Sequence, residues 1–442
     1  MRSLNAYIDN HHVGTLYEGE DIWRFDYKAQ WAQAPSGFDL APGLPRSTLS
    51  HLDGSTTRPV QWFFDNLLPE ELLRQAISKE ARIKGDDAFA LLEYLGAESA
   101  GSLTLLPPGQ PLPQGSTLRP LPDEQLNARI QALPHQTLTA GAPKRMSLAG
   151  AQNKLLVVYR DGKLYEPEGA TASTHILKPA HPDTNTYTAS VINEYVSMRL
   201  AAAAGLTVPA VHVHEASEPV YIVERFDRHV QVLGNADNGT PQLAVQRRHI
   251  IDACQLLNRA RTFKHSGASL QALRDIIQQT TNKAAARVRL FRWLVFNIVL
   301  ANDDCHLKNL SFFVSAQGIE VAPHYDLLAT SAYYTKAFAD EKAIWDAVPM
   351  AIALPGARLF SEVTAKAVLL AGTELGLPMP TGQRILKEVT TRLAAALQAE
   401  KANIERLHAN RAPGHVCTAG EVRFLRVLGS IIMADMFERL RA

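Results

Sequence analysis

The chain has 442 residues, of which 46% are hydrophobic and 20% are charged, and this composition predicts a globular protein with two or three domains, each with its own core. Its 45 Lys and Arg residues nearly balance its 44 Asp and Glu residues, which excludes the broad basic surface that drives sequence-independent DNA binding. Three widely spaced cysteines and the lack of a long apolar segment favour a cytoplasmic protein without a disulfide framework, export signal or membrane span.

The N-terminal hundred residues predict a small β-containing domain. Alternating apolar positions over 4–16, on either side of a polar turn, indicate a hairpin. Two helical stretches follow, the first over 62–84. A Pro- and Gly-rich stretch then begins that neither a helix nor a central strand can continue through. We therefore expect a domain at 1–106 and a linker at 107–120.

Residues 121–228 show the element order of a kinase small lobe, which is strands, one helix and two more strands. Strand patterns occur at 154–159 and 174–177. Apolar residues at helical spacing follow, with Ser190 as a possible N-cap and Gly205 as the stop. This order predicts a β-rich lobe built around a single helix.

Residues 229–442 predict a mainly helical large lobe. Its strongest helix carries an apolar stripe over 290–299 and leads into the polar cluster 302–309 and a hairpin around Gly318. The fold class that we predict is α+β, a protein-kinase-like two-lobed fold with a β-rich small lobe, an all-α large lobe and an extra N-terminal β-containing domain. A nucleotide is expected in the cleft between the lobes.

Candidate catalytic residues follow the buried helix. Asp304 and Asn309 have the D-x-x-x-x-N spacing of a kinase catalytic loop, in which the Asp orients the incoming hydroxyl and the Asn faces magnesium. Mg²⁺ prefers an octahedral set of oxygen ligands, and Asp326 follows the next hairpin, within Asp-Leu-Leu rather than Asp-Phe-Gly. Singly, each element is an ordinary helix end or polar turn, but their order and spacing favour phosphoryl transfer.

A lysine and a small-residue segment are candidates for phosphate contacts. Lys178 ends a short strand before a helix carrying Glu194, so the two could form the Lys–Glu pair that holds the α- and β-phosphates. Asn193 and Glu224 are rival partners for the amine, and a lone lysine at a strand end is usually a solvated charge. The segment SLAGAQNK at 147–154 could bring backbone amides close to phosphate, although alone it is typical of an ordinary turn.

Other reactive residues carry weaker signals. Ser147 lies beside Lys144 and Arg145, which makes it a candidate phosphorylation site. Cys305 and His306 are adjacent, and no second His or Cys lies at ligand spacing from them. We therefore expect no zinc site there.

Taken together, these motifs resemble the HipA serine/threonine kinases of bacterial toxin–antitoxin modules. The resemblance rests, in chain order, on FFDNLLP (63–69), SLAGAQNK (147–154), THILKP (174–179), NEY (193–195), VERFDR (223–228), NDDCHLKN (302–309) and YD (325–326).

The resemblance implies a role for each site residue. Asp304 is the catalytic base, Asn309 and Asp326 hold magnesium, and Ser147 matches an autophosphorylated serine whose modification disables the kinase by moving its loop. The implied ATP-binding residues are Ala149, Gly150, Ala151, Gln152, Asn153 and Lys154 over the phosphates, Lys178 on the phosphates, Glu224, Arg225 and Phe226 at the adenine hinge, Asp227 on the ribose side, and His306, Leu307, Lys308, Asn309, Tyr325 and Asp326 in the pocket.

The resemblance also implies ATP and Mg²⁺ as cofactors and an aminoacyl-tRNA synthetase, notably the glutamyl enzyme, as the protein substrate, with arrest of translation and growth. The implied partner is a HipB-like helix-turn-helix antitoxin, through which DNA is bound only indirectly. Two alternatives stay open. One is a small-molecule phosphotransferase, because related loops serve aminoglycoside and choline kinases. The other is a catalytically silent protein that binds antitoxin and DNA, against which the four residues Lys178, Asp304, Asn309 and Asp326 argue.

Overall fold

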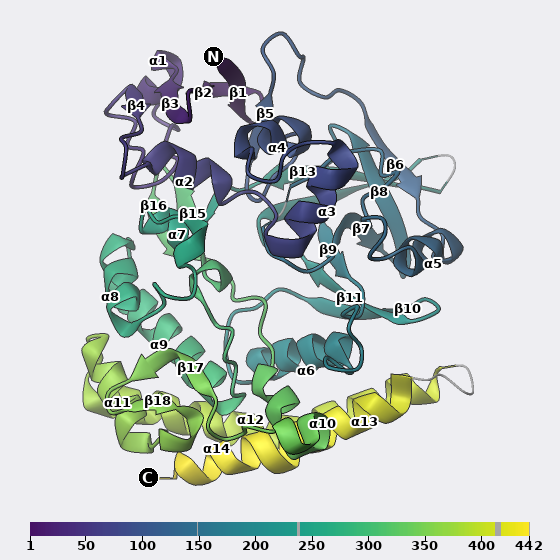
Figure 1. Ribbon diagram of the computed structural model, residues 1–442, viewed down its shortest axis with the longest axis vertical. Coiled ribbons are helices and arrows are strands. Elements are labelled where there is room, and N and C mark those ends of the chain that lie inside the picture. The colour runs from purple at the N-terminus through teal and green to yellow at the C-terminus, as the bar shows by residue number, and fades with distance from the viewer. Residues whose placement is uncertain (148, 237–238, 412–416, 442) are drawn as a thin grey trace. The chain divides into compact units, whose positions relative to one another are not determined.

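The computed structural model of the protein describes residues 1–147, 149–236, 239–411 and 417–441. The chain divides into two compact units, each assembled from three stretches of sequence (Figure 1). The first unit consists of Met1–Pro179, Ile222–Phe263 and Ser311–Ala322, and the second consists of Ala180–Tyr221, Lys264–Leu310 and Pro323–Ala442.

The first unit is rich in strands. Its elements are β1 (Arg2–Ile8), β2 (His11–Gly19), β3 (Ile22–Tyr27), α1 (Ala29–Gln33), β4 (Ser50–Leu52), α2 (Pro59–Asp65), α3 (Glu71–Ala81), α4 (Ala88–Leu95), β5 (Leu103–Leu106), β6 (Ser116–Pro120), α5 (Asp123–Gln131), β7 (Leu155–Arg160), β8 (Lys163–Gly169), β9 (His175–Lys178), β12 (Arg228–Asn235), β13 (Pro241–Arg247), β14 (Ile250–Asp252), α7 (Ala253–Leu256), β15 (Ser311–Ser315) and β16 (Gly318–Val321). Strand β11 (Pro219–Glu224) is divided between the units after Tyr221.

The N-terminal sheet has the strand order β4-β3-β2-β1-β5. Its pairs are antiparallel, and β1 alternates so that Leu4, Ala6 and Ile8 are buried, as period-two patterning requires. Helices α2 and α4 contact this sheet and each other (Figure 1). The single helix expected over 62–84 is wrong, because the chain leaves the helical path around Pro69, which has no N–H to donate, and two helices form instead.

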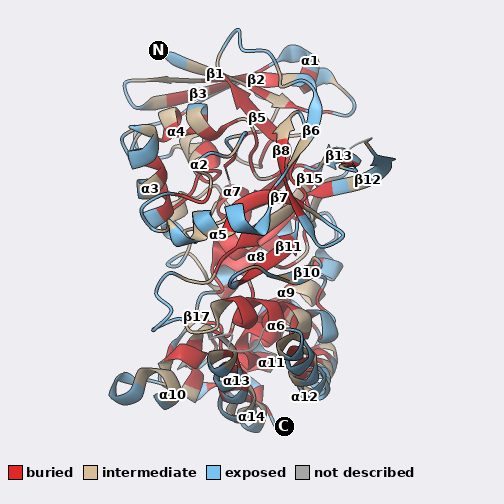
Figure 2. Cartoon of the chain, turned by 90° about the vertical axis from the view of Figure 1, so that its right-hand side faces the viewer, coloured by how far each residue is buried: buried red, intermediate tan, exposed pale blue. Residues whose placement is uncertain are grey.

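A second sheet of this unit runs in the order β11-β9-β7-β8-β6. Strands β7 and β11 are buried over most of their length (Figure 2), which explains their continuous apolar runs. Residues 116–120, expected as the end of a linker, form β6 at the sheet edge and pair with β8. The edge position explains how Pro120 is accommodated at the end of the strand, since an edge strand needs fewer ladder donors.

A buried carboxylate ties the N-terminal sheet domain to this second sheet. Glu98, fully buried, accepts hydrogen bonds from the Ser173 hydroxyl at 2.7 Å and from the guanidinium groups of Arg225 at 3.3 Å and Arg228 at 3.1 Å. The ammonium group of Lys144 contacts its other oxygen at 2.9 Å. These partners come from residues far along the chain, so Glu98 fixes several segments at one point.

The charges around Glu98 decide its protonation state. Burial alone would raise the pKa of its carboxyl, but the positive charges of Lys144, Arg228 and Arg225 outweigh that effect and hold the pKa below its ordinary value. The carboxylate therefore stays ionised in the folded chain, and its desolvation is offset by cations and hydrogen bonds.

The second unit is mainly helical. Its elements are α6 (Ser190–Ala203), β10 (Val211–Glu215), α8 (Leu270–Gln279), α9 (Lys283–Val299), α10 (Lys336–Ala339), β17 (Pro349–Leu354), β18 (Ala357–Leu359), α11 (Ala365–Glu374), α12 (Met379–Ala409), α13 (Cys417–Val427), a π-helical turn at Leu428–Ile432 and α14 (Met433–Arg439). The β17–β18 hairpin departs from the all-α large lobe that the sequence predicts.

The buried core of the second unit centres on α9. Helix α9 begins where the Asn282 side chain accepts a hydrogen bond from the Ala285 amide at 3.0 Å, and its residues from Leu290 onward are mostly buried. Ser190 is not an N-cap as expected. Ala189 holds that position in a left-handed conformation, and the Ser190 hydroxyl accepts a hydrogen bond from the His181 amide instead.

The α+β class and the extra N-terminal β-containing domain are confirmed. Among the described residues, no helix combines the length and apolar character needed to cross a lipid bilayer.

The Glu98 cluster predicts a large loss of stability for Glu98→Gln. The free energy of unfolding should fall by about 3 to 5 kcal/mol at neutral pH, because the buried cations lose their compensating charge. The folded-state pKa of Glu98 lies below its unfolded value, so this contribution is present above pH of about 4.3 and is lost as the pH falls further. Chemical denaturation at several pH values should therefore show that the difference in free energy of unfolding between the wild type and Glu98→Gln becomes smaller in acid.

Glu93, an exposed glutamate on α4, supplies a matched control for Glu98. Glu93→Gln should change stability by no more than about 0.5 kcal/mol. An equal effect of the two substitutions would contradict the role given to Glu98.

Candidate active site

The loop after α9 is shaped by one buried amide. The chain leaves the helix through Ala301, whose φ of 49° lies in the left-handed region. The Asn302 side chain then donates to Asn297 at 2.7 Å and accepts from the Asp304 amide at 3.1 Å and the Thr330 hydroxyl at 3.2 Å. Asn302 thus fixes the backbone immediately before Asp304.

The two adjacent aspartates of this loop lie in different environments. Asp303 accepts a hydrogen bond from the Ser331 hydroxyl at 3.4 Å, and burial raises the pKa of its carboxyl. Asp304 is the exposed residue of the otherwise half-buried or buried segment 301–310, with 54% of its side chain exposed. Asp304 is therefore the carboxylate that an incoming hydroxyl can reach.

Asn309 and Asp326 are held close to this loop. The Asn309 side-chain NH₂ donates to the Asp304 carbonyl at 2.9 Å, which turns the Asn309 side-chain oxygen the other way. The Tyr325 hydroxyl donates to the Lys308 carbonyl at 2.7 Å, and this bond ties the residue before Asp326 to the same loop. An amide oxygen and a carboxylate are the donors that Mg²⁺ prefers, so this pair fits a magnesium ion.

Asp326 has a strained backbone. Its φ of 57° places it in the left-handed region, which costs most L-residues about 1 to 2 kcal/mol and is tolerated best by Gly, Asn and Asp. Backbone strain of this kind concentrates at functional sites, where the surrounding structure imposes it. The left-handed backbone of Asp326 gives its carboxylate a direction that an extended backbone would not allow.

Glu194 and Tyr221 lie near Asp326. Burial and the charges of Glu194 and Asp326 raise the pKa of the Tyr221 hydroxyl well above its ordinary value. Glu194 is itself buried on α6. The charges of both carboxylates therefore act on the Tyr221 hydroxyl, and two like charges in one neighbourhood favour a cation beside them.

The first unit holds Ser147 and the segment 149–154. Ser147 is only 1% exposed; its hydroxyl donates to the Leu67 carbonyl at 2.6 Å and its amide donates to the Glu98 carbonyl at 2.7 Å. The next residue, Leu148, lies outside the described residues. The motifs FFDNLLP and SLAGAQNK are therefore in direct contact.

The half-buried segment 149–154 is closed by its own lysine. Lys154 donates to the Ala149 carbonyl at 2.5 Å, and Gly150, with a φ of 107°, accepts at its carbonyl from the Glu70 amide at 3.2 Å. A Cβ at Gly150 would lie 2.7 Å from the Lys154 ammonium group. The lysine end could shift to make room, but a φ of 107° is one that L side chains rarely adopt, so the backbone here favours glycine.

The remaining residues expected to bind ATP have distinct surroundings. Lys178 is buried at the end of β9. Glu224 is exposed, and the Phe226 ring meets the Phe313 ring edge-on at 6.0 Å. Arg225 is buried in the cluster around Glu98, and its contact at the adenine hinge stays a prediction.

Asp227 differs most from its expected role on the ribose side. Its carboxylate is buried and accepts hydrogen bonds from Arg225 at 2.7 Å, Arg228 at 2.9 Å and the Gly101 amide at 2.7 Å. These three donors all reach Oδ2, and the Arg225 Nε atom donates to Oδ1 at 3.0 Å, so a ribose hydroxyl would have to compete with them. The ribose contact of Asp227 stays a prediction, because Arg225 and Arg228 flank it in the sequence but their spacing alone does not show that they bind its carboxylate.

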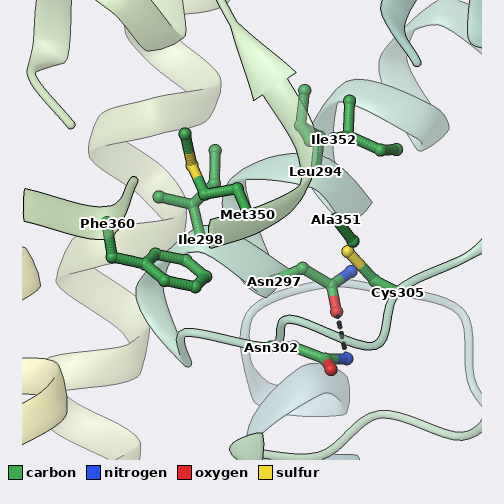
Figure 3. A pocket seen from close by; sticks show the side chains of 9 residues that line it. All are labelled: Leu294, Asn297, Ile298, Asn302, Cys305, Met350, Ala351, Ile352 and Phe360. Atoms are coloured by element: carbon green, nitrogen blue, oxygen red, sulfur yellow. Dashed lines mark hydrogen bonds between the residues drawn. The ribbon is translucent and has the colours of Figure 1, made fainter. Parts of the chain in front are cut away.

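A small, mainly apolar pocket lies under the catalytic loop (Figure 3). It is lined from α9, the loop and β17 by residues that include Leu294, Asn297, Cys305 and Ile352, and the Asn297–Asn302 hydrogen bond closes one side (Figure 3). Burial, together with the charges of Asp304 and Asp303, raises the pKa of the Cys305 thiol far above its usual range. Cys305 is therefore a packing residue and not a nucleophile.

The structure thus groups the expected site residues within each unit. The second unit brings together Asp304, His306, Leu307, Lys308, Asn309, Tyr325 and Asp326. The first unit contains Ser147, 149–154, Lys178 and 224–227. Asn302 and Tyr221 were missed as site residues, because the sequence does not show that the Asn302 amide fixes the loop or that the Tyr221 phenol lies near Asp326.

Two family models cover most of the chain. The HipA N-terminal domain matches residues 4–106, and the HipA-like C-terminal domain matches residues 146–397.

Individual relatives agree with these matches. The serine/threonine-protein kinase toxin HipA of Shewanella oneidensis is 33% identical over 347 residues, which are 73% of this chain and 75% of the relative. The putative kinase Y4mE of Sinorhizobium fredii is 35% identical over 350 residues, 75% of this chain and 78% of the relative. A solved complex of HipA, HipB and operator DNA from Shewanella oneidensis contains a chain that superposes with a TM-score of 0.76 at 26% identity, covering 98% of this chain and 97% of that one.

The fold and the relatives define the chain as a serine/threonine-protein kinase. The enzyme class and the kinase-like fold expected from the sequence are therefore confirmed. The class uses a nucleotide and a metal in general. More narrowly, the chain belongs to the HipA family of kinase toxins.

The strained position of Asp326 predicts different outcomes for two substitutions. Asp326→Ala should lower the free energy of unfolding by about 1 kcal/mol, because Ala tolerates the left-handed region poorly. Asp326→Gly should leave it nearly unchanged, because relief of strain offsets the greater freedom of Gly in the unfolded chain, roughly 0.4 to 1 kcal/mol. Both variants should lose phosphoryl transfer, since both lack the carboxylate.

Thermal unfolding and radiolabelled phosphate transfer, measured on the same preparations, would test this pair. Equal stability of the two variants would show that the backbone at this position is unstrained.

Proposed function

We propose that the chain transfers the γ-phosphoryl group of ATP, with Mg²⁺, to a Ser or Thr hydroxyl of a protein substrate, and that Asp304 is its catalytic carboxylate. One observation carries the proposal. In a loop fixed by buried hydrogen bonds from Asn302 and Asn309, Asp304 is the residue whose carboxylate faces solvent.

The roles of the chain's own groups follow from their positions. Asp304 would accept a hydrogen bond from the substrate hydroxyl and orient its oxygen for attack. Asn309 and Asp326 would supply the oxygen ligands of the metal, which neutralises negative charge on the phosphates when bound. Positioning and charge of this kind account for most catalysis of phosphoryl transfer.

Nucleotide contacts remain proposals for the other residues expected from the sequence. Support for Lys178 is its burial at a strand end, and support for 149–154 is a closed turn with a required glycine. We propose that Glu224, Phe226, His306, Leu307, Lys308 and Tyr325 line the nucleotide site, and that Arg225 and Asp227 contribute only through the architecture of the Glu98 cluster.

The proposed partner is a HipB-like antitoxin. Support comes from the solved Shewanella oneidensis complex, which contains HipA, HipB and operator DNA. DNA contact would then be mediated by the antitoxin, in keeping with the balanced charge of this chain. The proposed protein substrate is an aminoacyl-tRNA synthetase, supported by the family resemblance, and phosphopeptide mass spectrometry of a lysate incubated with the enzyme and ATP would identify it.

Asp304→Asn tests the catalytic assignment. The variant should fold normally, because the side chain is exposed, and phosphoryl transfer should drop by about 10² to 10⁴-fold, as expected for loss of a positioned catalytic base. Asp303→Asn is the matched control; it should lower stability more than Asp304→Asn does and lower the transfer rate less. Undiminished transfer by Asp304→Asn would exclude Asp304 as the base.

Ser147 is the proposed site of autophosphorylation. A phosphate adds about −1.5 to −2 charges and has no room at a side chain that is 1% exposed and donates to a carbonyl. Modification would therefore release the segment from Leu67 and Glu98 and disturb 149–154.

Limited proteolysis with trypsin can detect this release. In the wild type, Lys144 is bound to Glu98, and Arg145 lies over the Tyr94 ring at 3.9 Å, so cleavage after them should be slow. Ser147→Asp should accelerate cleavage at both sites, whereas Ser147→Ala should stay resistant and lose only about 1 kcal/mol of stability. Identical cleavage of all three proteins would contradict the proposed release.

A further inference from the structure

A second set of possible metal ligands surrounds the proposed catalytic carboxylate. Donor atoms of His265, Asp304 and His306 all lie within 4.8 Å of one another. Asp304 is 3.9 Å from the His265 Nδ1 atom and 4.0 Å from the His306 Nε2 atom, in each case measured from its Oδ1 atom. The two imidazole rings meet edge-on at 4.6 Å.

The backbone holds these three residues together. The Leu307 amide donates to the Lys264 carbonyl at 3.1 Å, which fixes the residue before His265 against the catalytic loop. A turn follows, in which the Ala268 amide donates to the His265 carbonyl at 2.9 Å. Within the loop, the His306 amide donates to the Asp304 carbonyl at 2.8 Å. Convergence of the side chains is thus set by main-chain bonds rather than by chance contact at the surface.

The spacing suits a small ion after a modest contraction. A tetrahedral zinc site with bonds of about 2.0 to 2.1 Å places neighbouring ligand atoms about 3.3 Å apart. The His265 and Asp304 side chains are 57% and 54% exposed, so they can move inward by rotation, while the largely buried His306 ring stays in place. Three protein ligands leave one position open to solvent, substrate or anion.

The donor types separate this set from the magnesium pair. Asn309 and Asp326 offer only oxygen, which suits Mg²⁺. Two imidazoles and one carboxylate suit Zn²⁺ and its first-row neighbours, which bind nitrogen donors far more tightly than Mg²⁺ does. The catalytic loop therefore presents two donor sets of different selectivity, and Asp304 belongs to the nitrogen-containing one.

We propose that His265, Asp304 and His306 form an inhibitory site for a zinc-class divalent ion, which blocks phosphoryl transfer by taking up the Asp304 carboxylate. Coordination neutralises the charge of the carboxylate and occupies at least one of its oxygens, so it becomes a weaker acceptor for the hydrogen bond that orients the substrate hydroxyl. The inhibitory half of this inference rests on the proposed function of Asp304. The binding half does not, since it depends only on the three ligands.

Zinc binding is measured first, without nucleotide. Metal-free full-length protein competes with a chromophoric chelator for Zn²⁺, and Co²⁺ absorption reports the ligand geometry. The wild type should bind one equivalent, and His265→Ala should weaken that binding at least about tenfold. His229→Ala, which removes an exposed histidine of β12 outside the cluster, should bind as the wild type does. Equal zinc affinity of wild type and His265→Ala would overturn the site.

Inhibition is measured next, with saturating Mg²⁺ and ATP and each variant normalised to its own zinc-free rate. Zinc should inhibit the wild type and His229→Ala at the concentrations that fill the site, and a chelator should restore the rate. For His265→Ala the midpoint of inhibition should move to at least tenfold higher zinc. Site-specific binding without inhibition would overturn the inhibitory role.

Failure of the proposed function can be distinguished from failure of the zinc site. A wild type that transfers no phosphate even without zinc refutes the proposed function, while the chelator competition still decides the existence of the zinc site by itself.

Discussion

The fully buried Glu98 carboxylate is the constraint on which the first unit depends. It binds Lys144 and the two arginines Arg225 and Arg228, so that the N-terminal sheet domain, the segment before Ser147 and the end of β11 meet at one charge. An apolar core could be repacked with small losses, but removing one charge from this cluster would leave the others buried and uncompensated. The positions of Ser147 and Asp227 both follow from this arrangement.

In the loop 302–309, buried polar groups again fix the backbone, but here these groups are neutral amides. Its backbone is fixed by the Asn302 and Asn309 amides, which satisfy buried polar atoms without adding net charge. Buried hydrogen bonds then restrict the loop to one conformation, in which Asp303 faces inward and Asp304 faces out. The chemical difference between these two identical neighbouring residues thus arises from their surroundings, since Asp303 is half-buried and Asp304 is exposed.

Local patterns in the sequence predicted many of the strands, helix α9 and the D-x-x-x-x-N spacing, because each depends on residues close together in the chain, but strands such as β6 and β17 were not expected. The environment of Glu98 could not be predicted in this way, since its arginine partners lie more than a hundred residues away. The division of helix 62–84 was missed although Pro69 signalled it. His265 escaped notice beside His306 because the contact depends on a main-chain bond between Lys264 and Leu307 that no spacing rule describes.

The exposure that qualifies Asp304 for catalysis also limits the enzyme. A base that must receive a protein hydroxyl cannot be enclosed by hydrogen-bond donors as Asp227 is, and the Asp304 side chain is accordingly 54% exposed and accessible to a cation. With His265 and His306 beside it, the same carboxylate would, under the two proposals, either orient a hydroxyl or bind a metal ion that prefers nitrogen ligands. Such competition is reversible and needs no change of fold, because it acts on an exposed side chain of the loop.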